Sequence, residues 1–165
     1  FKQKTAYEIS TRDWSSDVCS SDLAAFKAWC EFSQKTPTFD TSKIIQGGCA
    51  TKPLAPEVLA AYDAPYPDES YKAGARIFPT LVPASLDYPS SKENLAAWEV
   101  LKKWTKPFHC AFSDGDPVTR NGEWTFRKQI PGCEYSAHTT IVGAGHFLQE
   151  DRGPELAAFV NSTIA

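Results

Sequence analysis

Two stretches decide the fold of this chain: Phe108-His-Cys-Ala-Phe-Ser-Asp-Gly-Asp-Pro117 and Thr139-Thr-Ile-Val-Gly-Ala-Gly-His-Phe147. Each begins with a short apolar run and ends in a glycine-containing loop, the pattern of a buried parallel strand that leads into a turn. Residues 123–129, between them, predict a helix, and residues 154–164 predict a closing helix. Strand, helix, strand and helix in this order indicate an α/β class, at the end of a doubly wound sheet.

The loops that follow the two predicted strands carry an acid and a histidine. In doubly wound sheets the active residues gather beyond the carboxyl ends of the strands, and Asp116 and His146 both fall there. Acid first and histidine second is the chain order of the last two members of an α/β-hydrolase triad, whose nucleophile comes further upstream. We therefore expect His146 to be a catalytic base and Asp116 to orient it. Two alternatives stay open for the acid: Asp114 is a nearby rival, and the pair Asp116-Pro117 also begins ordinary turns.

The preceding residues, 24–104, read as helices and loops without a convincing strand. Ser90-Ser-Lys-Glu93 is a capping box. It predicts a helix whose apolar residues recur at helical spacing up to Leu101 and, more loosely, Trp104. The other predicted helices cover residues 24–32, 42–46, 55–62 and 71–78, the last broken by Pro79.

Composition excludes several classes of protein. The chain has 165 residues and a net charge of −3, with no basic stripe for nucleic acid or an acidic membrane. No apolar run approaches the roughly 20 residues that span a bilayer, and the first residues lack an export signal. The five cysteines form no C-x-x-C pair and the three histidines show no metal-ligand spacing. We expect a cytoplasmic protein with reduced thiols, no metal and no cofactor.

The first 23 residues do not read as native protein. Lys2 to Glu8 and Arg12 to Leu23 resemble one reading frame of a common short-read sequencing adapter, and the residues between them stand where its variable index would fall. The segment has neither helical nor strand periodicity. We expect residues 1–23 to be a non-native segment and the natural sequence to be truncated near Ala24; the alternative is a genuine N-terminal tail.

Residues 24–165 resemble the haloalkane dehalogenases. The resemblance is densest in Ala61-Tyr-Asp-Ala-Pro-Tyr-Pro-Asp-Glu-Ser-Tyr-Lys-Ala-Gly-Ala-Arg-Ile-Phe-Pro79, a specific signature of the helical cap, and continues in Asp116-Pro117 and Gly145-His-Phe147, which are general to α/β-hydrolases. It implies a helical cap over residues 24–104 and the C-terminal part of the main domain over residues 105–165. The fold would be an incomplete α/β-hydrolase: the cap plus the last two strands and helices of the sheet.

The resemblance also implies a mechanism. An aspartate displaces halide from a small haloalkane to give an ester, and a histidine then activates water to hydrolyse it. His146 matches this base and Asp116 matches its acid, whereas the nucleophilic aspartate has no counterpart in this sequence. We therefore expect a hydrolytic dehalogenase as the parent protein and an inactive chain as it stands. The partners are haloalkane, water and halide, with no nucleic acid and no membrane.

Halide recognition in the family uses indole N–H groups, which donate one hydrogen bond from an otherwise apolar ring. The resemblance assigns Trp29 to this role, and Phe26, Phe78 and Val82 to the walls of the substrate pocket. The residue pattern leaves plain packing inside the cap equally open for Trp29, because aromatic residues at helical spacing usually form a core.

Three other functions compete with dehalogenation. An epoxide hydrolase shares the plan but needs cap tyrosines, for which Tyr62, Tyr66 and Tyr71 are available. A serine esterase would need a nucleophile elbow upstream. The third alternative is a fragment without catalysis. The remaining residues of interest read as structural: packing is expected for Trp98 and Trp104, and a structural role for His109 and His138.

Overall fold

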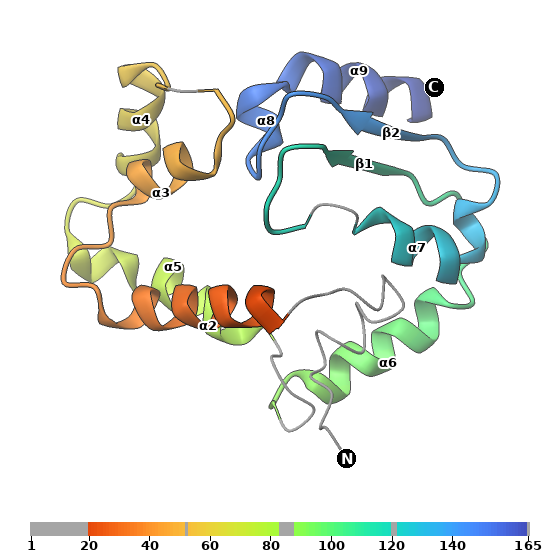
Figure 1. Cartoon of the computed structure of the whole chain (residues 1–165), viewed down its shortest axis with the longest axis horizontal. Helices are drawn as coiled ribbons and strands as arrows, with labels where there is room; N and C mark the ends of the chain where they lie inside the picture. Colours follow the sequence, from red (N-terminus) through yellow and green to blue (C-terminus); the bar gives the residue numbers. More distant parts are fainter. Residues whose placement is uncertain (1–19, 52, 83–87, 120–121, 165) are drawn as a thin grey trace. The chain divides into compact units, whose positions relative to one another are not determined.

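The chain forms two compact units in the computed structural model of Figure 1, which describes residues 20–51, 53–82, 88–119 and 122–164. The first unit contains residues 20–42 and 56–98, and the second contains residues 43–55 and 99–164, apart from the gaps just given. Residues 1–19 of the adapter-like segment lie outside the described residues. The predicted boundary near residue 104 between cap and main domain stays a prediction.

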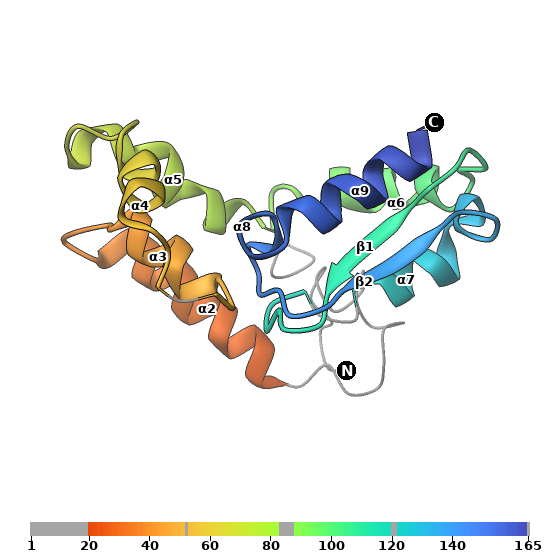
Figure 2. The same ribbon diagram turned by 90° about the horizontal axis from the view of Figure 1, so that it is seen from above.

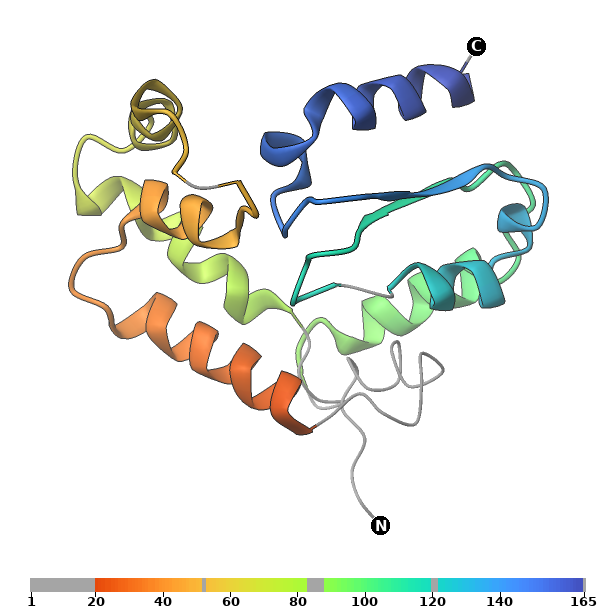
Figure 3. The same cartoon turned by 45° about the horizontal axis from the view of Figure 1, so that its top comes forward.

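The second unit is built on two parallel strands, β1 (Cys110–Ser113) and β2 (His138–Ile141). Their register pairs Cys110 with His138 and Ser113 with Ile141. Helix α7 (Glu123–Gln129) packs on β1, helix α9 (Gly153–Ile164) packs on β2, and the two helices lie on opposite sides of the strand pair (Figures 1 and 3). The predicted order of strand, helix, strand and helix is confirmed, and with it an incomplete α/β fold.

Both strands differ in extent from the prediction. Phe108 lies outside β1 because its N–H donates to Gly132 O and Ser136 Oγ, in the turn before β2, rather than to the ladder. Val142 lies outside β2 and is 70% exposed, because the chain turns at Gly143, whose φ is +74°. A positive φ favours glycine over residues with a side chain. The predicted strand ends at Phe108 and Val142 are therefore wrong, and the predicted burial is only partial, since Ile141 is the one buried residue of β2 and Thr140 is exposed.

Short helical turns connect the main elements of the second unit. The 3₁₀ turn η3 (Pro131–Cys133) links α7 to β2, and the four-residue helix α8 (Leu148–Asp151) comes directly before α9. Its buried apolar residues are Cys49, Leu54, Cys110, Ile130, Cys133, Ile141 and Ala144. Few residues thus form the described core of this unit, around a sheet of two strands.

The first unit contains helices and turns, with no strand among its described residues, as predicted. Its elements are α2 (Ser20–Lys35), α4 (Pro56–Asp63), η1 (Glu69–Lys72), α5 (Ala73–Ile77) and η2 (Phe78–Leu81). Helices α3 (Thr41–Gly48) and α6 (Ser91–Leu101) each begin in this unit and end in the other. Helices α2 and α5 run side by side in Figures 2 and 3 and are in contact.

Two predicted helix ends are corrected. The helix predicted over residues 71–78 does end ahead of Pro79, but α5 covers only Ala73–Ile77, and Pro79 lies in the first turn of η2, where a missing N–H costs no hydrogen bond. The capping-box helix stops at Leu101 rather than Trp104, because Lys103 and Trp104 donate their N–H groups to the carbonyls of Val100 and Leu101, three residues back. Hydrogen bonds to the third residue back form a tighter turn than the α-helix, so the α-helix ends there.

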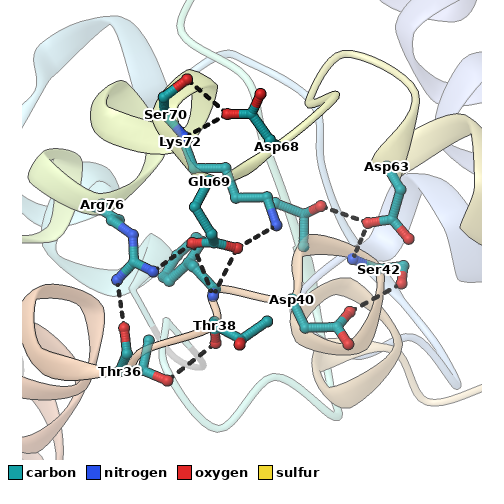
Figure 4. A network of polar contacts seen from close by, with 12 residues as sticks. Thr36, Thr38, Asp40, Ser42, Asp63, Asp68, Glu69, Ser70, Lys72 and Arg76 are labelled. Carbon is teal, nitrogen blue, oxygen red and sulfur yellow. Dashed lines mark hydrogen bonds and ion pairs between the residues drawn. The ribbon is translucent and has the colours of Figure 1, made fainter.

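A polar network holds the signature segment 61–79 to the turn after α2 (Figure 4). Glu69 accepts from the N–H of Phe39 and pairs with Lys72 and Arg76. Arg76 also donates from Nη1 to the carbonyls of Ser33 and Thr36, at 3.1 and 2.9 Å, so it satisfies the C-terminal end of α2. Lys72 and Arg76 lower the pKa of Glu69 to about 2.

Candidate active site

The loops after β1 and β2 bring Asp116 and His146 together. Both carboxylate oxygens of Asp116 lie 3.1 Å from Nδ1 of His146. Asp116 is buried, whereas the imidazole is partly exposed. The rival Asp114 lies elsewhere, since its carboxylate accepts the N–H of Gly143 at 2.7 Å. Of the two candidate acids, the geometry therefore places Asp116 beside the histidine.

This contact decides which imidazole nitrogen is free for chemistry. An ionised carboxylate only accepts hydrogen bonds, so Nδ1 carries the proton of the neutral ring. Nε2 then has the lone pair and can take a proton from water or another donor. An acid that fixes the tautomer of a general base in this way is the arrangement of a catalytic dyad.

The Asp116 carboxylate is kept ionised by further donors. Burial alone would raise its pKa, but the hydroxyl of Thr119, the N–H of Val118 and His146 together lower it below the usual value. Oδ1 accepts from Val118 N at 2.7 Å, and Oδ2 accepts from Thr119 Oγ1. Thr119 was missed by the sequence reasoning, although an aspartate followed two and three residues later by such donors is the pattern of an Asx turn.

The two loops are tied to each other beside the dyad. Ser113, at the end of β1, donates from Oγ to the carbonyl of Gly145 at 2.8 Å. Gly115 N donates to Ala144 O at 3.0 Å, and a Cβ on Gly115 would lie 2.6 Å from that oxygen. Only glycine allows this approach, so the loops that carry Asp116 and His146 are in direct backbone contact.

A third segment reaches the histidine loop within the second unit. The N–H of His146 donates to Gly48 O, at the end of α3, at 2.8 Å. A Cβ on Gly48 would lie 2.5 Å from the ring of Phe147, which itself packs edge-on against the imidazole at 5.1 Å between ring centroids. Sequence reasoning missed Gly48, because no local pattern links it to residues a hundred positions away.

The predicted halide and pocket residues all lie in the first unit. Trp29 stacks on Phe32 and also packs near Phe39, so its ring belongs to an aromatic cluster of the first unit. Phe78 and Val82 are 69% and 39% exposed at η2, and Phe26 is partly exposed on α2. The roles of Trp29, Phe26, Phe78 and Val82 in binding stay predictions.

The other two histidines make structural contacts. His138 accepts the N–H of Cys110 at Nδ1 and lies 3.0 Å from Cys133 O at Nε2, which assigns its proton to Nε2. His109 Nδ1 lies 3.2 Å from Ala137 O. Among the described residues no cluster of three His, Cys, Asp or Glu side chains is placed to hold a metal, and no helix is long and apolar enough to span a bilayer.

Comparison with known proteins identifies the relatives. A haloalkane dehalogenase of Psychrobacter cryohalolentis is 54% identical over 132 residues, which cover 80% of this chain and 43% of that protein. This part of the chain is homologous to haloalkane dehalogenases. The haloalkane dehalogenase of Mycobacterium marinum is 44% identical over 133 residues, covering 81% of the chain and 44% of the relative. The chain thus spans less than half the length of these curated haloalkane dehalogenases.

A solved structure gives the same family. A tetrameric haloalkane dehalogenase from Paraglaciecola agarilytica superposes with a TM-score of 0.70 at 28% identity, covering 81% of this chain and 44% of that one. No family model matches the chain. These relatives favour a haloalkane dehalogenase over the epoxide hydrolase and serine esterase alternatives.

Proposed function

We propose that this chain carries the base and the acid of a hydrolytic haloalkane dehalogenase, with His146 as base and Asp116 as the residue that orients it. The observation that supports this most directly is the buried carboxylate 3.1 Å from Nδ1 of His146, in a chain homologous to dehalogenases. Because the chain matches less than half of its relatives, the activity belongs to the full-length protein.

The proposed reaction has two steps. In the first, an aspartate of the full-length enzyme attacks the carbon of a haloalkane, forming an ester and releasing halide. In the second, Nε2 of His146 takes a proton from water as that water attacks the ester carbonyl. The C–O bond of the ester then breaks, the alkoxide leaves as alcohol with the proton of the new carboxyl group, and His146 releases its proton to solvent. Only the second step needs this chain's dyad.

This division predicts the behaviour of His146→Gln. In the chain extended upstream to the length of its relatives, the variant should release about one halide per enzyme and then stop, because alkylation continues and hydrolysis does not. General base catalysis is typically worth about 10²–10⁴-fold, so steady turnover should fall by at least that range. Rapid-quench measurement of bromide release from dibromoethane checks this. Steady turnover near the wild-type rate would contradict the role of His146.

We propose further that Trp29 donates its indole N–H to the departing halide. Trp29→Phe keeps most of the aromatic packing and removes the donor. A hydrogen bond to a charged partner is worth roughly 1.5–3 kcal/mol, so halide affinity should fall about tenfold or more. Bromide quenching of fluorescence in the extended enzyme measures this, with Trp98→Phe as the matched control. Equal dissociation constants for both variants would leave Trp29 as cap core.

A further inference from the structure

A second aspartate, Asp151 at the end of α8, lies directly behind the histidine loop. It is 8% exposed, and its carboxylate accepts three backbone N–H groups. Gly145 N and Ala50 N donate to Oδ2, each at 2.8 Å, and Thr51 N donates to Oδ1 at 2.7 Å. All of these residues belong to the second unit.

These donors come from the two segments that meet at His146. Gly145 is the residue before the histidine, and Ala50 and Thr51 follow Gly48, whose carbonyl accepts the N–H of His146. Asp151 therefore binds the backbone of both segments that meet at the hydrogen bond between His146 N–H and Gly48 O. A Cβ on Gly145 would lie 2.4 Å from Gly48 O and 2.8 Å from Ala50 N, so the segments touch with no room for a side chain.

The ionised form of Asp151 is stabilised by the groups that donate to it. Burial alone would raise its pKa, but the three amides and the Thr51 hydroxyl lower it below the usual range. The carboxylate is thus ionised at neutral pH and can hold all three donors at once. An amide side chain of the same shape could not, because its NH₂ group would face an N–H donor.

We propose that Asp151 is a positioning residue, which fastens the loop of His146 to residues 48–51 and so sets where the imidazole stands relative to Asp116. Asp116 touches the ring at Nδ1, but the place of the ring also depends on the backbone that carries it. Catalytic groups need to be held within about 0.5 Å of their working geometry, and backbone contacts of this kind supply such precision. The inference rests on the proposed function of His146.

The test uses the 165-residue chain and Asp151→Asn, without any need for turnover. NMR of labelled protein would follow two signals: amide exchange at Gly145, Ala50 and Thr51, and the Nδ1–H proton of His146 that is bound to Asp116. We expect the three amides to exchange at least tenfold faster and the Nδ1–H signal to broaden or vanish, while the β1 and β2 amides keep their protection. Glu155→Gln, the same charge change on the exposed start of α9, is the matched control and should resemble wild type.

Several outcomes would overturn the proposal. Unprotected amides at these positions in the wild-type chain, or unchanged exchange in Asp151→Asn, would mean that the carboxylate does not hold them. Faster exchange with an unchanged Nδ1–H signal would leave Asp151 a structural residue only. If the asparagine variant unfolds the strands, Asp151→Glu, which keeps the charge and displaces it by one methylene, takes its place with the same expected signals. Loss of the strands in that variant too would also overturn the proposal. None of these readings depends on dehalogenase activity, so a failure of the proposed function stays distinguishable.

Discussion

Both units of this protein use a carboxylate to hold distant backbone together, but they stabilise its charge differently. In the first unit, Glu69 is partly exposed and pairs with Lys72 and Arg76 while it accepts from Phe39 N. In the second unit, Asp151 is buried and accepts from three backbone amides. One arrangement relies on side-chain cations and the other on neutral peptide groups.

The difference has consequences for rigidity and for the response to solvent. Long cationic side chains lose rotamer freedom when they pair, and salt screens ion pairs that stay partly exposed, as those of Glu69 do, so their contribution falls as the salt concentration rises. Backbone amides are already ordered by the fold and carry no net charge. We infer that the amide-held carboxylate suits the loop of His146, the proposed base, and that the ion-paired one suits the contact between the signature segment and the turn after α2 in the first unit.

The largest loss of stability is expected at Gly145 of the second unit, where the backbone leaves no room for a side chain. Gly145→Ala would force a Cβ to 2.4 Å from the backbone oxygen of Gly48, and such overpacking typically costs about 1–3 kcal/mol. The matched control is Gly47→Ala inside α3, where the added Cβ would meet no neighbouring side chain or distant backbone within 4 Å. This variant should stabilise its helix by roughly 0.5–1 kcal/mol. Urea unfolding resolved by amide exchange in each unit measures both. Equal stability of the two variants would contradict the close contact.

A smaller effect is expected from Arg76 in the first unit. Arg76→Met keeps the aliphatic stem but removes the donors to Ser33 O and Thr36 O, so the unit should lose about 1–2 kcal/mol. Arg76→Lys keeps the charge without the planar fork and should recover only part of this. Amide exchange in α2 and at Phe39 would report the loss, and β1 and β2 should not change. Full recovery by lysine would show that charge alone matters.

The smallest effect concerns acid and salt, and it tests the comparison itself. Glu69 and Asp151 both have lowered pKa values, so each stabilises the fold fully above its ordinary pKa and loses that contribution as the pH falls through the lowered one. For Glu69 this window runs from about 4.5 down to about 2. Salt should move the Glu69 midpoint upward, because it screens Lys72 and Arg76, and should leave Asp151 nearly unchanged.

Amide chemical shifts give the reporters for that titration. Phe39 N–H follows Glu69 and Thr51 N–H follows Asp151, each titrated at about 0.05 and 0.5 M salt. Asp63 is the internal control, since it lies in the first unit but is held by the hydroxyl of Thr41 and the N–H of Ser42. Asp63 should behave like Asp151. If salt shifts the midpoint of Asp63 as it shifts that of Glu69, then the location in the first unit, and not the charge of the donors, decides the salt dependence.

Sequence reasoning located the elements and the histidine because these depend on neighbours in the chain. Apolar runs ended by Ser-Asp-Gly-Asp-Pro and Gly-Ala-Gly-His-Phe predicted both strands and the loops of Asp116 and His146. The capping box predicted the start of α6, and the apolar pattern predicted α7 and α9. The predicted strand ends at Phe108 and Val142 were wrong, since a hydrogen bond to a distant turn and a positive φ ended the ladder there.

The resemblance in residues 61–79 pointed to the family, and the relatives bear this out. What the sequence by itself determined is thus local: which residues form helices, where an acid and a histidine follow strands, and which family the pattern matches. The tertiary structure alone decided that Asp116 rather than Asp114 meets His146, and that Asp151 joins this loop to Ala50 and Thr51. The physical reason is that these are contacts of single polar groups across up to a hundred residues, which leave no periodicity in the sequence.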